Sequence, residues 1–542
     1  MSTRLFILTV LCAFSIEVTA SQYEWDNVDR VIAVGDVHGA YPELVSLLQA
    51  AQVIDAQLRW TGGTTHLVSL GDLLDRGPQS AKAMDLLMRL QDEAQSSGGH
   101  VHVLLGNHEV MNLTGDLRDV SKKEYEALDL IGGHTRAFAL NGHYGRWLAT
   151  LPFVIRINDS VFAHGGFSTV LSTLTLEQIN QDARNALTSL LSEGQRLREE
   201  GLLAPTGDLL SVAYSLTEEQ TAALGDRFLQ ASKNPLLGGI SPQWYRGTAR
   251  CHKLIEQKSF VSTLQHLGAT RGIMGHTPTP NREVNARFSR SAFIIDTGML
   301  ASVYKGNARA IEIMAHTVRA FGPEGDTAII NLPRADPQAA LENSDYNTRE
   351  SDNGVQRLEL NNGDEPLHAH FLKLSKRDRN RALAAYRLDR LLGLRMVPST
   401  VARKVDGKEG IIMQWDREAL SERERAAGQR QRPNYCEHGS DYMLLAAFDA
   451  LIGKLDRSAD NLWYDPITWQ IRLTDNHRAF GRSAALPQYA TQPELPPHMA
   501  EILQNLTSAE LSNLLAGLLK SAEIKALVKR RDMILNWPVS QN

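Results

Sequence analysis

The feature that most constrains this chain is a series of short apolar runs, each followed by a polar residue. Residues 31–34 form such a run, and apolar residues at helical spacing follow from Leu44 to Ala51, which indicates a strand and then a helix. Open α/β sheets bind ligands at the carboxyl ends of their strands, so the polar residues at these ends are expected to share one site. They are Asp36, His38, Asp72, Asn107, His108, His164, His276 and Asp296.

Five short motifs contain most of these residues. They are GDVHG at 35–39, GDLLDRG at 71–77, GNHE at 106–109, HGG at 164–166 and GHTP at 275–278. Their glycines let the backbone turn tightly beside a bound ion or phosphate. The residue types suit two divalent metal ions, which Mn, Fe or Zn would fit better than Ca. We expect Asp36 and His38 at one ion, Asn107, His164 and His276 at the other, and Asp72 between them.

These motifs resemble those of the phosphoprotein phosphatase branch of the calcineurin-like metallophosphoesterases. Residues 106–118, GNHEVMNLTGDLR, resemble its bacterial Shewanella-like phosphatases, and the whole resemblance covers roughly residues 29–320. It implies a four-layer αββα sandwich, a metal-bridging hydroxide as nucleophile, and His108 as the acid that protonates the leaving oxygen. It also implies that Asp75 orients His108 and that Arg76 and Arg246 bind the substrate phosphate, with Arg118 as a third candidate.

Two positions narrow the expected reaction. The related diadenosine polyphosphate hydrolases lack an aspartate where Asp75 stands, which favours phosphomonoester or phosphoprotein substrates. Pro278 stands where the nuclease and phosphodiesterase relatives have a further metal-binding histidine. The expected activity is therefore metal-dependent hydrolysis of a phosphomonoester, on a phosphorylated protein (Ser/Thr or Tyr) or on a small molecule.

The sequence divides into two large parts of mixed α/β composition. Residues 25–325 are predicted to form the phosphatase domain, with a helical insert at about 168–240. The polar stretch 326–366 is predicted to be a linker or edge segment, and residues 367–542 are predicted to form a C-terminal α+β domain. The oligomeric state is left open.

The C-terminal part resembles atypical kinase-like folds. The resemblance implies a catalytic role for Asp456, metal ligation by Asn461 and Asp475, an ATP-binding role for Lys373, and so a Mg-ATP site. Against it, the sequence lacks a glycine-rich phosphate loop. Three alternatives stay open: an active kinase that makes the protein bifunctional, a degenerate domain that binds a nucleotide or a partner, and a scaffold without turnover.

The N-terminus and the overall charge bear on location and partners. Residues 1–20 have Arg4, an apolar core and small residues before Ser21, as a signal peptide does, so we expect export to the periplasm or secretion. No apolar run outside this segment is long enough to cross a membrane. A net charge of -5 argues against nucleic acid as a partner. Cys251 and Cys436 are expected to be separately packed thiols, although a bridge between them is left open.

Overall fold

The computed structural model describes most of the chain from residue 22 to residue 539. Within that range the described residues exclude 130–131, 205–206, 216–225, 335, 353–354, 363–365, 433–434, 437–438, 466 and 489–493. The expected signal peptide, residues 1–20, therefore lies outside the described residues. No helix among the described residues is long and apolar enough to cross a membrane.

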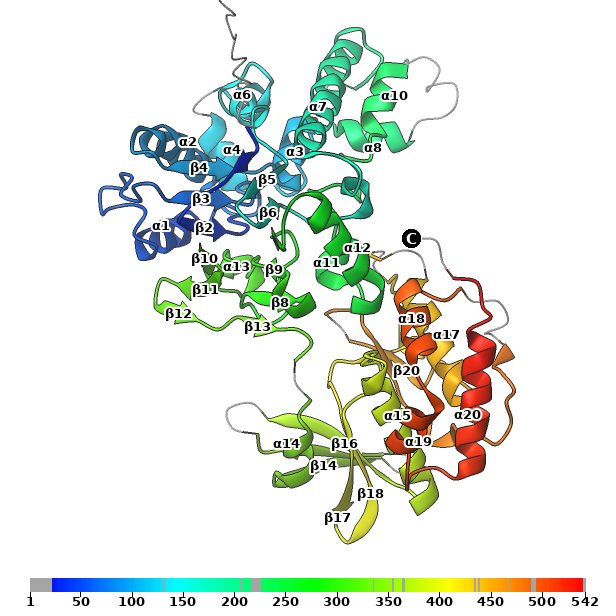
Figure 1. The fold of residues 1–542 in the computed structure, drawn as a ribbon. Helices are drawn as coiled ribbons and strands as arrows, with labels where there is room; N and C mark the ends of the chain where they lie inside the picture. Colours follow the sequence, from blue (N-terminus) through cyan, green and yellow to red (C-terminus); the bar gives the residue numbers. More distant parts are fainter. Residues whose placement is uncertain are drawn as a thin grey trace, which may run out of the picture.

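Two mixed sheets form the centre of the N-terminal part (Figure 1). The first runs in the order β1 (Glu24–Trp25), β5 (Val154–Ile157), β6 (Ser160–Ala163), β7 (Arg271–Met274), β9 (Ala292–Ile294), β8 (Asn285–Arg287) and β13 (Ile330–Asn331). The second runs in the order β12 (Gly325–Thr327), β11 (Thr317–Gly322), β10 (Ala310–Met314), β2 (Arg30–Val34), β3 (His66–Ser69) and β4 (His100–Val103).

The two sheets pack face to face between layers of helices. Alternate residues of β2 divide between two cores, because side chains of a strand point to opposite faces. Val31 and Ala33 meet Phe162 and Ile273 of the other sheet, whereas Ile32 and Val34 join the core beneath the helices. The helices on the outer faces are α1 (Tyr41–Ala50), α2 (Ser80–Ser96), α7 (Leu176–Glu199) and α12 (Lys253–His266). The predicted αββα sandwich is therefore present in the N-terminal part.

Shorter helices fill the loops at the strand ends. Between β4 and β5 lie α3 (Asn107–Thr114), α4 (Lys122–Asp129), α5 (His134–Phe138) and α6 (His143–Leu148). The segment predicted as a helical insert contains the 3-10 helix η1 (Thr169–Leu171), then α7, α8 (Leu209–Ser215) and α10 (Asp226–Ser232). After it come α11 (Gly247–Arg250), the 3-10 helix η2 (Phe288–Arg290) and α13 (Ala301–Tyr304). Thr175 begins α7 with a capping box, its side chain accepting from the backbone N–H of Gln178.

The C-terminal part combines an antiparallel sheet with a helical half. The sheet has the order β14 (Tyr346–Asp352), β15 (Val355–Leu360), β16 (Leu367–Lys373), β18 (Lys408–Gln414) and β17 (Thr400–Val405), with α14 (Gln338–Asn343) and α15 (Lys376–Leu391) against it. The helical half contains β19 (Leu420–Ser421), β20 (Leu462–Tyr464), β21 (Ile471–Leu473), η3 (Asn476–Arg478), α16 (Glu422–Ala427), α17 (Ser440–Ile452), α18 (Pro497–Asn505), α19 (Ser508–Leu514) and α20 (Ser521–Ile534).

Two expectations from the sequence need correction. The stretch 326–366 was expected to be a linker or edge segment, and it is not a plain linker, because it contains α14 and the strands β14 and β15, with β14 at the edge of the C-terminal sheet. Its strands are polar because one face meets water, so hydrophobic pattern alone does not distinguish them from a loop. The expectation of two separate thiols is also wrong, because Cys251 and Cys436 form a disulfide whose Cα atoms lie 5.5 Å apart.

Candidate metal and phosphate site

The loops after five strands bring the expected ligands to one edge of the sandwich. In the second sheet β2, β3 and β4 run parallel, and in the first sheet β6 and β7 do so, which brings their carboxyl ends together. Every expected ligand is at most 4% exposed. So many buried polar groups require shared partners, since an unpaired one costs several kcal/mol, on the order of 2–7. The ligands are Asp36, His38, Asp72, Asn107, His164 and His276.

Asp72 lies at the centre of this cluster. Its Oδ2 lies 3.7 Å from Nε2 of His38, 3.9 Å from Nε2 of His108 and 3.2 Å from Nε2 of His164. Two groups of ligand atoms lie close enough to hold a metal ion, His38 with Asp72 and His108, and Asp72 with His164 and His276. Because Asp72 belongs to both groups, its carboxylate can contribute to two ions at once.

The imidazoles are held with one ring nitrogen toward the site. Nδ1 of His38 lies 2.8 Å from the carbonyl oxygen of Leu74, and Nδ1 of His164 lies 2.9 Å from that of Leu70. A carbonyl can only accept, so it fixes the proton on Nδ1 and leaves the Nε2 lone pair free for an ion. Burial lowers the pKa of His38 to about 3, which keeps this ligand neutral. His164 Nε2 also lies 3.0 Å from Oδ1 of Asn107, which places that amide in the same group.

His108 has a different partner. Its Nδ1 lies 2.5 Å from Oδ2 of Asp75, and the Nδ2 amide of Asn112 donates to Oδ1 of Asp75 at 3.0 Å. Burial alone would lower the pKa of His108, but the carboxylates of Asp72 and Asp75 outweigh it and raise that pKa above its ordinary value. The imidazole is thus oriented by Asp75, with Nε2 facing Asp72 and able to carry a proton.

The comparisons with known proteins agree with this geometry. Residues 29–231 match the family model described as calcineurin-like phosphoesterase. The chain contains a calcineurin-like metallophosphoesterase domain. It is similar to Shewanella-like protein phosphatase 2 of Arabidopsis thaliana, with 27% identity over 54% of this chain and 77% of the plant protein. With the His and Asp groups of the site, these findings make the protein a metal-dependent phosphatase, and so a hydrolase.

Two further similarities concern the same part of the chain. Shewanella-like protein phosphatase 1 of Plasmodium berghei is 26% identical over 51% of this chain and 69% of its own length. The solved structure of a cold-active protein-tyrosine phosphatase from a psychrophilic Shewanella species is 26% identical, covering 56% of this chain and 80% of that one with a TM-score of 0.45. All three similarities cover little more than half of this chain.

The residues of the phosphoesterase site fit divalent metal ions. The donor set mixes imidazole nitrogens with carboxylate and amide oxygens, as transition metals prefer. Burial, together with the neighbouring Asp296 and Asp72, raises the pKa of Asp36 well above its ordinary value. Such crowding of buried carboxylates is relieved by a cation. Gly275 leaves space beside Asp36, because a Cβ atom there would lie 2.2 Å from Oδ1 of Asp36.

Several site residues have backbone conformations that are unfavourable for their side chains. Left-handed φ angles occur at His38 (49°), Asp72 (50°), Asp75 (71°), Arg76 (66°) and His276 (62°). Each such non-glycine residue costs about 1 kcal/mol or more, and these conformations persist only where surrounding contacts enforce them. The strain gathers in the loops that turn the side chains of the phosphoesterase site inward.

Glu109 holds two of these loops together. Its carboxylate accepts from the backbone N–H groups of Asp72, Leu73 and Gly106, each at 2.8 Å. Asp296 similarly accepts from the N–H of Gly298 at 3.0 Å and lies beside the ligands. Both residues therefore support the ligands in the structure.

The arginines expected to bind phosphate lie in different surroundings. Arg76 places Nη1 3.5 Å from Nε2 of His38 and stacks on Tyr304, with 5.3 Å from Cζ to the ring centroid. Arg246 donates to the carbonyl of His276 at 2.6 Å, directly at the metal ligands. Arg118 is instead largely exposed, and its guanidinium pairs with Asp116 at 2.6 Å. Arg76 and Arg246 thus lie at the site, whereas no described contact brings Arg118 to it.

The expected kinase-like residues lie on the loops around β20 and β21. Asp456 and Asp475 both approach the buried Nζ of Lys454, at 2.7 and 3.0 Å. Oδ1 of Asn461 accepts from the backbone N–H of Ser458 at 3.0 Å. Lys373 is exposed at the end of β16, and no described contact joins it to these carboxylates.

Three residues at the phosphatase site were not expected from the sequence. Asn112 holds Asp75, and its position four residues after His108 on α3 is a signal that helical periodicity could have supplied. Tyr304 stacks on His38, with 5.5 Å between the ring centroids. Tyr435 lies over Arg246, with 5.8 Å from Cζ to the ring centroid. Tyr304 and Tyr435 approach only through folding, and no local pattern marks them.

Proposed function

We propose that the protein removes phosphate from phosphorylated side chains of proteins by means of a dinuclear metal centre. One observation carries the proposal: the oriented pair His108 and Asp75 lies beside Asp72, which both groups of candidate ligands share. The relatives named as protein phosphatases support a phosphoprotein substrate over a small phosphomonoester.

The residues of the site divide the work of hydrolysis. Asp36, His38, Asp72, Asn107, His164 and His276 would hold two metal ions, which when bound lower the pKa of coordinated water and neutralise phosphate charge. Arg76 and Arg246 would bind the phosphoryl oxygens, since guanidinium groups match them in geometry and charge. His108 would donate its Nε2 proton to the leaving oxygen, while Asp75 keeps the ring in the required orientation.

Metal-dependent turnover tests this proposal. Purified protein lacking residues 1–20 would be assayed with Mn, Fe and Zn on an aryl phosphate and on phosphoserine and phosphotyrosine peptides. We expect hydrolysis with at least one metal, Mn being the first choice. Asp72→Asn should lose nearly all of it because both ions lose a ligand. Hydrolysis that needs no metal, or that is the same in Asp72→Asn, would disprove the proposal.

We also propose that the protein acts outside the cytosol, in the periplasm or after secretion. The disulfide between Cys251 and Cys436 supports this location, because such bonds persist in oxidising compartments. Fractionation of the cells that make the protein, with a cytosolic enzyme as marker, tests the location. Recovery of the activity with the cytosolic marker would contradict it.

A second function is proposed for the C-terminal part, namely binding of Mg-ATP at a kinase-like site. The convergence of Asp456 and Asp475 on Lys454 favours it, because paired carboxylates near an ammonium group suit a metal-bound phosphate. Binding of ATP with and without Mg would be measured by calorimetry, and transfer of labelled phosphate by autoradiography. Asp475→Ala should abolish the binding, and equal binding by this variant would remove the assignment.

A further inference from the structure

A cleft between the two parts of the molecule adjoins the phosphatase site. Its volume is about 1000 Å³. One wall comes from α11 and from Thr277 and Pro278, which directly follow the candidate metal ligand His276. The opposite wall comes from the C-terminal part, including Trp415 and Trp469. This interdomain cleft therefore begins at the residue that follows a candidate metal ligand, close to where a bound substrate would extend from the metal site.

Two arginines follow the loop that leads from the metal site into the interdomain cleft. Arg246 donates to the carbonyl of His276 and, at 3.2 Å, to Oγ1 of Thr277. Arg246 directly precedes α11, and Arg250, four residues later at the end of that helix, donates to the carbonyl of Pro278 at 3.1 Å. Residues four apart share a face of a helix. Arg246 therefore lies at the metal end of this row and Arg250 at the cleft end.

The guanidinium of Arg250 forms no ion pair among the described residues. Among the described residues its guanidinium donates to a carbonyl, no carboxylate lies within ion-pair distance, and its Nε is buried without a hydrogen bond. Burial lowers the pKa of this side chain. A partly buried cation without a counter-charge is costly, and an anion in the cleft would relieve that cost.

No acidic residue among the described residues of the cleft forms an ion pair with Arg250, although the charge of Asp465 favours the protonated guanidinium from a distance. Asp336 is held by Arg390, with Nε and Oδ2 2.7 Å apart, and Asp441 pairs with Arg432. Asp465 accepts from the backbone N–H groups of Ile467 and Thr468, which close its own turn. The lining keeps an excess of basic side chains, so the cleft favours an anionic occupant.

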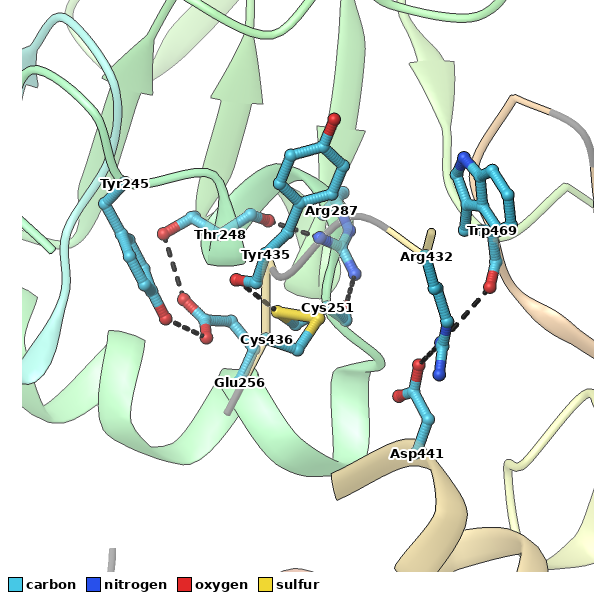
Figure 2. The surroundings of a disulfide bond; sticks show 10 residues. All are labelled: Tyr245, Thr248, Cys251, Glu256, Arg287, Arg432, Tyr435, Cys436, Asp441 and Trp469. Carbon is cyan, nitrogen blue, oxygen red and sulfur yellow. Dashed lines mark hydrogen bonds and ion pairs between the residues drawn. A yellow bond between two sulfur atoms is a disulfide. The ribbon is translucent and has the colours of Figure 1, made fainter. Parts of the chain in front are cut away.

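The disulfide fixes the wall beside Arg250. Cys251 is the next residue along the chain, and its bond to Cys436 brings a segment of the C-terminal part against α11 (Figure 2). The ring of Tyr435 lies over Arg246, and the carbonyl oxygen of Tyr435 lies 3.3 Å from Sγ of Cys251. The C-terminal part thereby closes one side of the space in front of both arginines.

We propose that Arg250 and the interdomain cleft bind a second anionic group of the substrate, close in sequence to the phosphorylated residue. This inference rests on the proposed phosphoprotein phosphatase function. Four residues of helix rise about 6 Å, and an extended peptide covers that distance in about two residues. The substrate is therefore a phosphorylated segment with an acidic residue, or a second phosphorylated residue, about two positions away.

Matched peptides test the inference. One phosphotyrosine peptide carries Gln at the three positions on each side, and a series replaces one Gln at a time by Glu or by phosphoserine. We expect Glu about two positions away to raise kcat/KM about tenfold over the Gln peptide, mainly through KM. A larger gain with phosphoserine would identify phosphate as the preferred second anion, and a larger gain with Glu would identify carboxylate.

The ratio of kcat/KM for the peptide with the second anion to kcat/KM for the Gln peptide should fall to about one in Arg250→Met. Arg146→Met is the matched control, because Arg146 also donates to a backbone carbonyl but lies on α6, away from the cleft. The control should keep the wild-type ratio. Equal kcat/KM for the Gln peptide and for every Glu and phosphoserine peptide in the wild-type protein, or an unchanged ratio in Arg250→Met, would overturn the inference. Absence of metal-dependent hydrolysis of every peptide would instead reject the proposed function.

Discussion

The pair of His108 and Asp75 shows how a single contact can control the chemistry. Asp75 accepts from Nδ1 of the imidazole, and Asn112 holds Asp75 from its other oxygen. The carboxylate therefore selects the tautomer and the ring orientation that leave Nε2 toward the substrate. Its effect on turnover is open to direct measurement.

Asp75→Asn is expected to lower kcat about 10²- to 10³-fold, because the amide no longer enforces the required proton position on His108. KM should change much less, since Asp75 does not contact the phosphate. Steady-state kinetics on an aryl phosphate measure both. Asp85→Asn is the control, as Asp85 accepts from the hydroxyl of Tyr144 away from the site. A kcat within twofold of wild type would contradict the assigned role.

A second group of histidines lies away from the phosphatase site. Nε2 of His102 lies 3.0 Å from Nδ1 of His66, on neighbouring strands, and His100 is close to both. Burial, with His100 nearby, lowers the pKa of His66 to about 4. The ordinary value in the unfolded chain is about 6.5. As the pH falls from 6.5 toward 4, the unfolded chain therefore binds a proton that the folded chain does not.

Stability should consequently decrease across this pH range, by about 1 kcal/mol for such an imidazole. The midpoint of urea unfolding at pH 7.5 and at pH 5 measures the decrease. His66→Gln should show a smaller decrease than the wild type, whereas His316→Gln, at an exposed position, should show the same one. If His66→Gln loses as much stability on acidification as the wild type, His66 does not contribute to the loss. The pKa of His66 would then not be lowered in the folded protein.

At the scale of elements, the start of α3 depends on a glycine. A Cβ atom on Gly106 would lie 2.3 Å from Oδ1 of Asp72 and 2.7 Å from Oε2 of Glu109. Neither side chain can move away freely, because Glu109 holds three backbone N–H groups. The helix and the loop after β3 can approach each other only with glycine at this position.

Gly106→Ala should therefore shift Asp72 and weaken metal binding about tenfold or more, as changes around metal ligands commonly do. Metal titration followed by calorimetry measures the affinity. Gly239→Ala is the control, because a Cβ atom there meets nothing within 4 Å. Retention of full metal affinity in Gly106→Ala would show that the loop has room to adjust.

The sequence predicts elements with local signals far better than those that depend on distant pairing. The strands that end at Asp36, Asp72 and His164 are apolar and are followed by glycine-containing motifs, so both the strands and the site could be recognised. Residues 346–352 are polar and become a strand only by pairing with β15, so they resemble a linker. Tyr435 reaches the site through a disulfide across 185 residues, which no local pattern encodes.

At the scale of the whole molecule, the disulfide joins the two parts. It closes a loop of 185 residues, and a bond across so long a loop stabilises a protein by about 2–5 kcal/mol. The contacts around it include Arg287, which donates to the carbonyls of Thr248 and Cys251 (Figure 2). The bond therefore supports α11 as well as the connection between the parts.

Cys436→Ser is expected to loosen the C-terminal part from α11 and to lower the melting temperature. Limited proteolysis, with calorimetric melting alongside, measures both effects. A reductant should lower the melting temperature of the wild type and leave that of Cys436→Ser unchanged. The variant lacks the disulfide, so it shows any effect of the reductant that does not come from breaking this bond. Equal melting temperatures of oxidised and reduced wild type would show that the remaining contacts suffice.

The left-handed residues around the metal site have a consequence for how this protein responds to change. His38, Asp75 and Arg76 occupy conformations that glycine or asparagine adopts more easily. Selection for thermal stability alone would favour replacing these residues, and the resulting proteins would be more stable but inactive. At this site, higher stability and catalytic turnover therefore oppose each other. Substitutions that raise stability without lowering turnover must lie elsewhere in the chain.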